Sequence, residues 1–240
     1  MSARCYHLAG VEARYQDKSA LIVDELAFRA GQLNVVAGLN GSGKSTLLNV
    51  LAFLKQPSHG VVEFSGEPVT WERTQLQKLR RSVTLVQQAP YLFRGSVGMN
   101  IAFGAKARGL GGEALWKRVK ESLESVGLSG FEERNANGLS GGEARRVALA
   151  RALACDPEVI LLDEPLAYVD ELSTRLIENL VVTLVDRGVL VIVSSHDSTL
   201  GTRLKGRTIR LFGGQLMHEP EQHEVYVGGE TSESRAYAIV

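Results

Sequence analysis

The stretch GLNGSGKS, residues 38–45, constrains the fold of this chain more than any other stretch. It fits the pattern G-x-x-x-x-G-K-[ST], with a valine-rich run at residues 32–37 before it and a helix-forming run at residues 46–54 after it. Such a loop turns its backbone N–H groups and the positive end of the next helix toward a phosphate. The sequence therefore predicts a strand, a phosphate-binding loop and a helix in succession. A glycine-rich turn that binds nothing is the alternative.

Each residue type in the loop has a separate task. The glycines allow a sharp turn and a close approach of the backbone to phosphate oxygens. Lys44 supplies a mobile cation for the outer phosphates, and Ser45 offers a hydroxyl to Mg²⁺. We expect the nucleotide phosphates to be bound by Gly38, Asn40, Gly41, Ser42, Gly43, Lys44, Ser45 and Thr46.

Strand and helix signals alternate along the chain. Apolar runs predict strands at residues 32–37, 60–64, 83–86, 159–162 and 189–193. Runs that are apolar on both faces are typical of strands buried in a parallel sheet. Between residues 90 and 154 the pattern is helical, with Leu115, Val119 and Leu123 at i, i+4 spacing and Gly127 as a helix end. The sequence predicts an α/β core interrupted by a helical insertion.

Composition and charge exclude several classes of function. Lys plus Arg and Asp plus Glu both total 27, so the chain lacks the positive charge that attracts nucleic acid. The pairs Arg80-Arg81 and Arg145-Arg146 are interpreted as solvated helix faces. No apolar run reaches the roughly 18 residues of a membrane span, and the N-terminus has no signal-peptide pattern. We expect a cytoplasmic chain whose membrane work, if any, depends on another polypeptide.

Two adjacent carboxylates, Asp163 and Glu164, follow the apolar run at residues 159–162. Neighbouring side chains in a strand point to opposite faces, so the two acids should have different tasks. Asp163 is the better candidate for the Mg²⁺ shell, and Glu164 is then free to polarise an attacking water as general base. The alternative is a pair of acids at a strand end, with Pro165 ending the element.

A second stretch, LSGGE at residues 139–143, has the sequence of a helix start. Ser140 and Glu143 have the spacing of a capping box. Gly141 and Gly142 are poor helix formers, costing about 1 kcal/mol each in a helix interior. Their bare backbone lets a phosphate approach the helix N-terminus closely. The stretch is therefore either a cap alone or a cap that is also an anion site.

The order of the motifs resembles the nucleotide-binding subunits of ABC transporters. The phosphate loop, VQQAP, LSGGE, ILLDEP, Asp170 and SSHD follow one another, and the resemblance covers about residues 6–214. It implies a P-loop NTPase (RecA-like) fold, mostly parallel, with an N-terminal antiparallel β portion and an α-helical insertion. The domain is expected at residues 1–214: core about 1–88 and 155–214, insertion about 89–154. Residues 215–240 are interpreted as a polar extension.

The resemblance also implies a head-to-tail dimer with two ATP molecules. Each ATP would lie between the phosphate loop of one copy and Ser140, Gly141 and Gly142 of the other. Asp170 would lie at the dimer seam, although it is also placed to cap the helix that follows it. Glutamine is the common family residue at position 143; Glu143 completes the capping box, so no loss of function is expected.

Three further roles are implied by the resemblance. Gln88 would sense the γ-phosphate and contact a membrane subunit. It would also contribute to the Mg²⁺ site with Ser45 and Asp163. Gln88 is chosen over Gln87 because it lies two residues before Pro90. His196 would contact the γ-phosphate and orient the water with Glu164, making Glu164, His196, Gln88 and Lys44 the catalytic set. Tyr15 would stack on adenine. The simpler alternatives are a strand-end histidine and a strand tyrosine.

The expected partners are a second copy of the chain, an integral-membrane permease and, indirectly, an extracytoplasmic solute-binding protein, with no nucleic acid. The expected location is the inner face of the cell membrane. Residues 51–108 are most similar to tungstate-type oxyanion importers, which implies import. An ATP-gated protein that levers or signals to a membrane partner without transport is the alternative, because its catalytic motifs would be the same.

Overall fold

The computed structural model describes residues 5–167 and 169–217. Within them, ten strands form one sheet in the order β5-β4-β1-β2-β10-β9-β3-β8-β7-β6. The strands are β1 (Cys5–Tyr15), β2 (Lys18–Arg29), β3 (Leu33–Ala37), β4 (His59–Phe64), β5 (Glu67–Pro68), β6 (Val83–Val86), β7 (Val159–Asp163), β8 (Leu190–Ser195), β9 (Arg207–Phe212) and β10 (Gln215–Met217). All five strands expected from apolar runs are present, with ends shifted by at most two residues.

The sheet has a parallel part and an antiparallel part. Strands β6, β7, β8, β3 and β9 pair in parallel, and β7 and β8 are buried along nearly their whole length. Strands β5, β4, β1 and β2 pair antiparallel. The predicted mostly parallel core with an antiparallel N-terminal portion is confirmed. The sheet also includes β10, so it continues three residues past the boundary expected at residue 214, whereas 218–240 lie outside the described residues.

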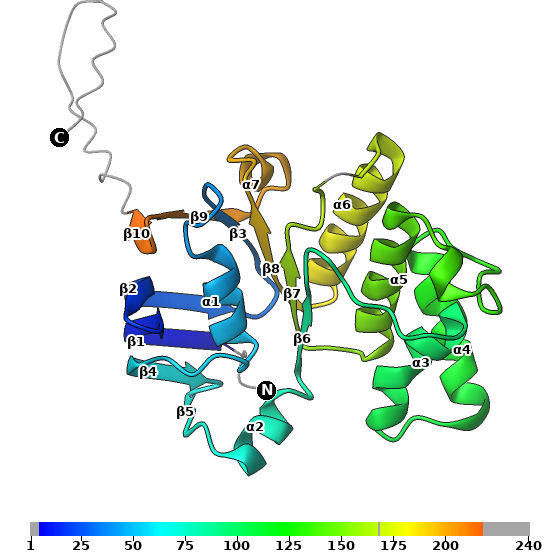
Figure 1. The fold of residues 1–240 in the computed structure, drawn as a ribbon, viewed down its shortest axis with the longest axis horizontal. Helices are drawn as coiled ribbons and strands as arrows, with labels where there is room; N and C mark the ends of the chain where they lie inside the picture. Colours follow the sequence, from blue (N-terminus) through cyan, green and yellow to red (C-terminus); the bar gives the residue numbers. More distant parts are fainter. Residues whose placement is uncertain (1–4, 168, 218–240) are drawn as a thin grey trace, which may run out of the picture.

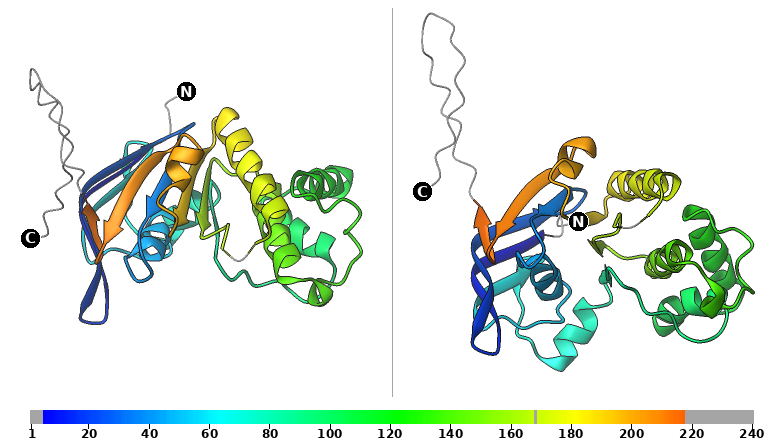
Figure 2. Two further views of the ribbon diagram at one scale, coloured as in Figure 1. Left: turned by 90° about the horizontal axis from the view of Figure 1, so that it is seen from above. Right: turned by 45° about the horizontal axis from the view of Figure 1, so that its top comes forward.

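The helices lie on the two faces of the parallel strands. They are α1 (Lys44–Leu51), α2 (Arg73–Leu79), α3 (Val97–Ala107), α4 (Gly112–Ser125), the short 3₁₀ helix η1 (Ala136–Gly138), α5 (Gly141–Ala154), α6 (Glu171–Asp186) and α7 (Leu200–Arg203). One core joins α1 to the antiparallel strands, and a second joins α3–α6 to the opposite face of the sheet. Figures 1 and 2 show α3, α4 and α5 grouped beside α6, away from the antiparallel strands.

One expectation about local structure is wrong, and a second is met only in part. The helix after the phosphate loop begins at Lys44 and ends at Leu51, because Phe53 adopts a left-handed backbone conformation with φ of 59°. The arginine pairs are not simply solvated: Arg80 donates to the Phe53 carbonyl, and Arg145 donates to the Ala167 carbonyl. Each arginine therefore joins its helix to a distant loop by donating to a backbone carbonyl of that loop.

Close backbone packing at an irregularity of β1 and β4 requires glycine at position 60. The β1–β4 register shifts between Ala9 and Glu12, and Gly60 has φ of 83° beside this shift. A Cβ on Gly60 would lie 2.2 Å from the Gly10 carbonyl oxygen. Gly66 has nearly the same backbone, with φ of 82°, but a Cβ there would meet nothing within 4 Å.

We predict that Gly60→Ala destabilises the protein more than Gly66→Ala. The Gly66 variant should cost about 1–2 kcal/mol for the left-handed backbone alone. The Gly60 variant should cost a further 1–3 kcal/mol or so, because the Gly10 backbone must shift. Urea unfolding of both variants measures the difference. An equal loss of unfolding free energy in the two variants would show that the backbone of β1 is not packed closely against Gly60.

Candidate functional site

The loop between β3 and α1 is shaped by close backbone contacts. The Gly38 N–H donates to the Ser195 carbonyl at 3.2 Å, which joins the loop to the end of β8. A Cβ on Gly38 would lie 2.4 Å from the Leu211 oxygen. Gly43 has φ of 100°, and a Cβ there would lie 2.8 Å from the Ala20 oxygen. Glycine is therefore required at both ends of the turn that leads into α1.

Lys44 is buried within this loop and is held by three oxygens. Its Nζ donates to the carbonyls of Gly38 at 2.7 Å and Leu39 at 3.1 Å. The same Nζ lies 3.2 Å from Glu164 Oε1, and both side chains are less than a tenth exposed. Their contact leaves neither side chain without a polar partner away from water, where an unpaired charge is costly. The sequence motif on α1 and the acid after β7 thus meet directly.

The two adjacent acids, Asp163 at the end of β7 and Glu164 directly after it, have different partners. Asp163 Oδ1 accepts a hydrogen bond from Ser194 Oγ at 2.6 Å. Glu164 has left the strand, with φ of 49°, and its Oε2 lies 2.9 Å from His196 Nδ1. His196 is 62% exposed, so one edge of the Glu164 carboxylate contacts a group that reaches solvent. The sequence analysis did not single out Ser194. Aligning β7 and β8 as parallel neighbours would have placed Ser194 beside Asp163.

A cavity of about 320 Å³ lies at the phosphate loop. It is lined by Ala20, Asn40, Gly41, Ser42, Gly43, Lys44, Ser45, Thr46, Gln88 and Glu164. Gln88 is therefore next to the loop, whereas Gln87 does not line this cavity. Asp163 does not line it either, but borders an adjoining small cavity together with Gln88 and Glu164. The hydroxyl of Ser45, the amide of Gln88 and the carboxylate of Asp163 are oxygen donors of the kind that Mg²⁺ binds, so these residues fit that ion.

The predicted capping box is present at the start of α5. Glu143 N–H donates to Ser140 Oγ at 3.3 Å, and Ser140 N–H donates to Glu143 Oε2 at 2.8 Å. Hydrogen bonds from Ser140 lower the pKa of the Glu143 carboxyl, and Arg134, 3.0 Å away, lowers that pKa further. Glu143 is therefore held in its charged form, the form that the positive end of the helix favours.

No contact among the described residues requires the two glycines after Ser140. A Cβ on Gly141 or Gly142 would meet nothing within 4 Å. None of these three residues lines the cavity at the phosphate loop. Figure 1 shows α5 and α1 on opposite sides of β6 and β7. The phosphate loop and the LSGGE helix start therefore do not form one site within a single described chain.

Asp170 and Tyr15 have local contacts of their own. Asp170 caps α6, accepting from Ser173 N–H at 2.9 Å and from Ser173 Oγ at 2.7 Å, and these bonds lower the pKa of its carboxyl. The Tyr15 ring is half exposed, lies under Lys55 Nζ at 4.5 Å and does not line the phosphate cavity. Helix capping was one of the two roles predicted for Asp170, and a place at the dimer seam was the other. Adenine stacking by Tyr15 stays a prediction.

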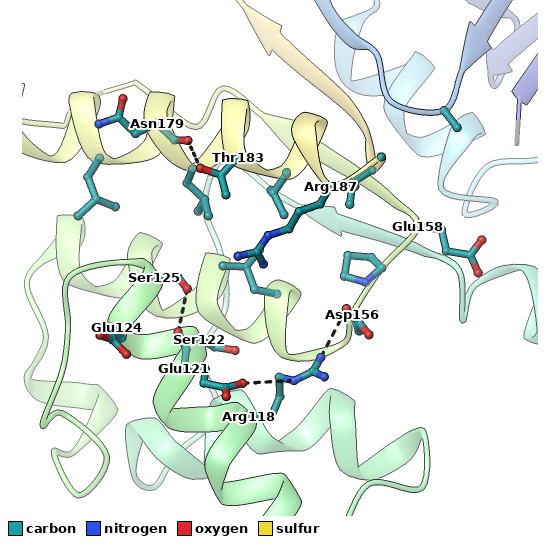
Figure 3. Close-up of a pocket in the computed structure, with 18 residues that line it drawn as sticks. Arg118, Glu121, Ser122, Glu124, Ser125, Asp156, Glu158, Asn179, Thr183 and Arg187 are labelled. Carbon is teal, nitrogen blue, oxygen red and sulfur yellow. Dashed lines mark hydrogen bonds and ion pairs between the residues drawn. The ribbon is translucent and has the colours of Figure 1, made fainter. Parts of the chain in front are cut away.

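A larger cavity, of about 1100 Å³, lies elsewhere (Figure 3). It is bordered by α4, α6 and the residues that enter β7, such as Asp156 and Glu158. Charged groups of both signs line it, and Arg118 pairs with Asp156 at 3.5 Å. Because Asp163 and Glu164 follow the opposite end of β7, this cavity is separate from the phosphate site.

Comparisons with known proteins agree with this arrangement. Residues 23–167 match a family described as "ABC transporter". The chain is 36% identical to the energy-coupling factor transporter ATP-binding protein EcfA of Methanocaldococcus jannaschii, covering 91% of this chain and 79% of that protein. It is 34% identical to the phosphate import ATP-binding protein PstB 2 of Natronomonas pharaonis, covering 99% and 87% respectively.

A solved structure has the same architecture. It is the dimeric ATP-binding cassette MJ0796 in a post-hydrolysis state bound to ADP and Pi. The TM-score is 0.83 at 31% identity, over 90% of this chain and 97% of that one. Among residues 5–167 and 169–217, no helix is both long enough and apolar enough to cross a bilayer.

Proposed function

The chain belongs to the ABC transporter ATP-binding family, and from this premise we propose that it hydrolyses ATP as a head-to-tail dimer and drives import through a separate membrane permease. The observation that supports this function most directly is Glu164, buried between Lys44 and His196 beside the phosphate loop. An acid in that position can act on a water at the terminal phosphate. The members of this family are ATPases, and the arrangement has the groups that hydrolysis needs.

In the proposed reaction, ATP binds with its phosphates against the N–H groups of residues 38–46. Lys44 exchanges its carbonyl contacts for phosphate oxygens, which frees Glu164 from the ion pair at 3.2 Å. Glu164 then accepts a proton from the attacking water, while His196, 2.9 Å from the same carboxylate, orients the base and contacts the γ-phosphate. The water oxygen bonds to the γ-phosphorus as the bond to the β-phosphate oxygen breaks.

The metal site of this reaction is assigned to Ser45, Gln88 and Asp163. When bound there, Mg²⁺ offsets the negative charge of the outer phosphates. Gln88 borders the phosphate cavity, and Asp163 borders the adjoining one with Gln88 and Glu164. The Ser45 hydroxyl, the Gln88 amide oxygen and the Asp163 carboxylate would hold the ion.

Each active site is proposed to be shared by two chains. The capped N-terminus of α5 presents Ser140, Gly141 and Gly142 with no partner that explains the glycines among the described residues. A helix start of this kind binds anions through its free N–H groups. In a head-to-tail dimer it would meet the ATP of the second chain, with Asp170 near the seam. Tyr15 would then stack on the adenine of its own chain's ATP.

A groove between the core and the helical insertion is the proposed permease contact. It has a volume of about 430 Å³ and lies where β6 leads through Gln87 into the insertion. Its lining includes Leu54, Tyr91, Phe93 and Phe103, which are 55%, 70%, 38% and 58% exposed. A concentration of exposed aromatic side chains is typical of a protein interface. Because Gln88 follows Gln87 directly, a partner in this groove would be one residue from the ATP site.

The proposed substrate class is an oxyanion such as tungstate. The similarity of residues 51–108 to tungstate-type importers supports it, as does the relative named for phosphate import. An extracytoplasmic solute-binding protein would deliver the oxyanion to the permease. The ATPase chain itself would then work on the inner face of the membrane.

We predict that Glu164→Gln binds ATP but hydrolyses it about 10²- to 10⁴-fold more slowly, the range for a lost general base. Turnover and nucleotide affinity are measured separately, the latter by titration. Glu121→Gln, which changes an exposed acid on α4, is the control and should keep normal turnover. Normal turnover in Glu164→Gln would remove Glu164 from the proposed role.

We predict that Ser140→Arg abolishes the ATP-dependent dimer while leaving ATP binding by the single chain unchanged. The bulky cation would occupy the anion site that the second chain's ATP needs. Loss of the cap also costs about 0.5–2 kcal/mol, so a thermal melt checks folding. The variant is made in the Glu164→Gln background and sized with and without ATP. A dimer that persists in Ser140→Arg, as expected for the exposed control Ser125→Arg, would contradict the shared site.

We predict that Phe103→Asp lowers recovery of the permease with this chain from solubilised membranes by about tenfold or more, as expected for loss of a central aromatic contact. Phe212→Asp is the control, since Phe212 is 65% exposed but does not line the groove. Equal recovery with both variants would exclude the groove as the contact.

The recovered complex also separates import from the alternative function. In vesicles with the solute-binding protein, tungstate, molybdate or phosphate should raise ATP turnover if an oxyanion is imported. If the membrane partner has no transport path, or if no oxyanion changes ATP turnover, the result would favour the alternative, in which the chain moves or signals to a membrane partner without transport.

A further inference from the structure

We propose that Ser194 is a positioning residue for hydrolysis, holding Asp163 and Glu164 in different orientations. This inference rests on the proposed roles of the two acids. Ser194 lies on β8 and is fully buried. It is the first residue of SSHD, the stretch in which only His196 was given a role, and neither of its bonded partners is on its own strand.

The hydroxyl of Ser194 has one partner as a hydrogen-bond donor and another as an acceptor. It donates to Asp163 Oδ1 at 2.6 Å and accepts from the Glu164 N–H at 2.8 Å. A short O–H···O⁻ bond to a carboxylate is stronger than a bond between neutral groups. One oxygen atom thus restrains the side chain of the first acid and the backbone of the second.

The backbone at Glu164 needs such a restraint. Its φ of 49° lies in the left-handed region, which costs a residue with a side chain about 1–2 kcal/mol. The strained conformation turns Glu164 out of β7, toward Lys44 and His196. Without the bond to Ser194 Oγ, a buried N–H would lose its acceptor, and the extended conformation of a continuing strand would compete. In that conformation the carboxylate would no longer face the phosphate loop.

The strand register makes Ser194 the residue able to do this. Asp163 pairs with Ser194 across β7 and β8. The next serine, Ser195, accepts a hydrogen bond from the Asp197 N–H through its Oγ at 3.0 Å, and among the described residues its hydroxyl bonds to neither acid. The two serines therefore have separate tasks: Ser195 holds the turn after His196, and Ser194 connects the acids across the strands.

The test compares Ser194→Ala with a buried serine far from the site. Ser194→Ala should slow ATP turnover about 10- to 100-fold, since small displacements of a catalytic group have effects of this size. ATP affinity should change by less than about threefold, because the phosphate loop keeps its own contacts. Ser122→Ala removes a buried hydroxyl on α4 and should keep normal turnover.

A second readout, the size of the protein in the presence of ATP, does not require a turnover assay. Slow hydrolysis lets the ATP-bound dimer accumulate, so Ser194→Ala should form a dimer with ATP that sizing detects, as is expected of Glu164→Gln. In the double variant Ser194→Ala/Glu164→Gln, turnover should fall less than about threefold below Glu164→Gln alone, because Ser194 acts through the acid already removed. If the double variant instead lost turnover by the product of the two single-variant factors, the proposal would be overturned.

The outcomes separate this inference from the proposed function. Normal turnover in Glu164→Gln contradicts the function of the acid itself. Loss of turnover in Glu164→Gln with turnover in Ser194→Ala within about twofold of the unmodified chain contradicts only the role of Ser194. If Ser194→Ala melts below the assay temperature, Ser194→Cys, which keeps an atom at the γ position and hydrogen-bonds weakly, is judged by the same criteria.

Discussion

The parallel pairing of β3, β8 and β7 is the constraint on which the site depends. Parallel strands end at the same edge of a sheet, so the phosphate loop after β3, His196 after β8 and the two acids at the end of β7 converge there. The Gly38 N–H bond to the Ser195 carbonyl joins the first two segments, and the Ser194 bonds join the last two. Residues more than a hundred positions apart thus become neighbours without any loop having to reach across.

Charge then organises what the strands bring together. Lys44 and Glu164 are both buried and lie 3.2 Å from one another, so neither lacks a partner away from water. A nucleotide phosphate competes with Glu164 for the same ammonium, so ATP binding and release of the base are coupled in the proposed reaction. His196 is mostly exposed and contacts the other carboxylate oxygen, which connects the buried pair to the surface where a second chain would dock.

Local signals were sufficient for the elements and for most of the site. The phosphate loop, the capping box of Ser140 and Glu143, and the buried strands were predicted because short-range chemistry decides them: glycine freedom, helix-end N–H groups and apolar runs. Element ends were less predictable. Phe53 in the left-handed region ended α1 early, and β10 extended the sheet to Met217 because β9 and β2 offered free edges.

By itself the sequence determined the chemistry, since G-x-x-x-x-G-K-[ST], LSGGE and the DE pair specify which groups are available and in what order. Only the tertiary structure decided which of those groups meet. It placed Glu164 against Lys44 and His196, kept the LSGGE helix start out of the phosphate cavity, and put Ser194 between the acids. The physical reason is register: cross-strand partners depend on how whole strands align, and a serine in an apolar run has no local pattern that reveals its partner.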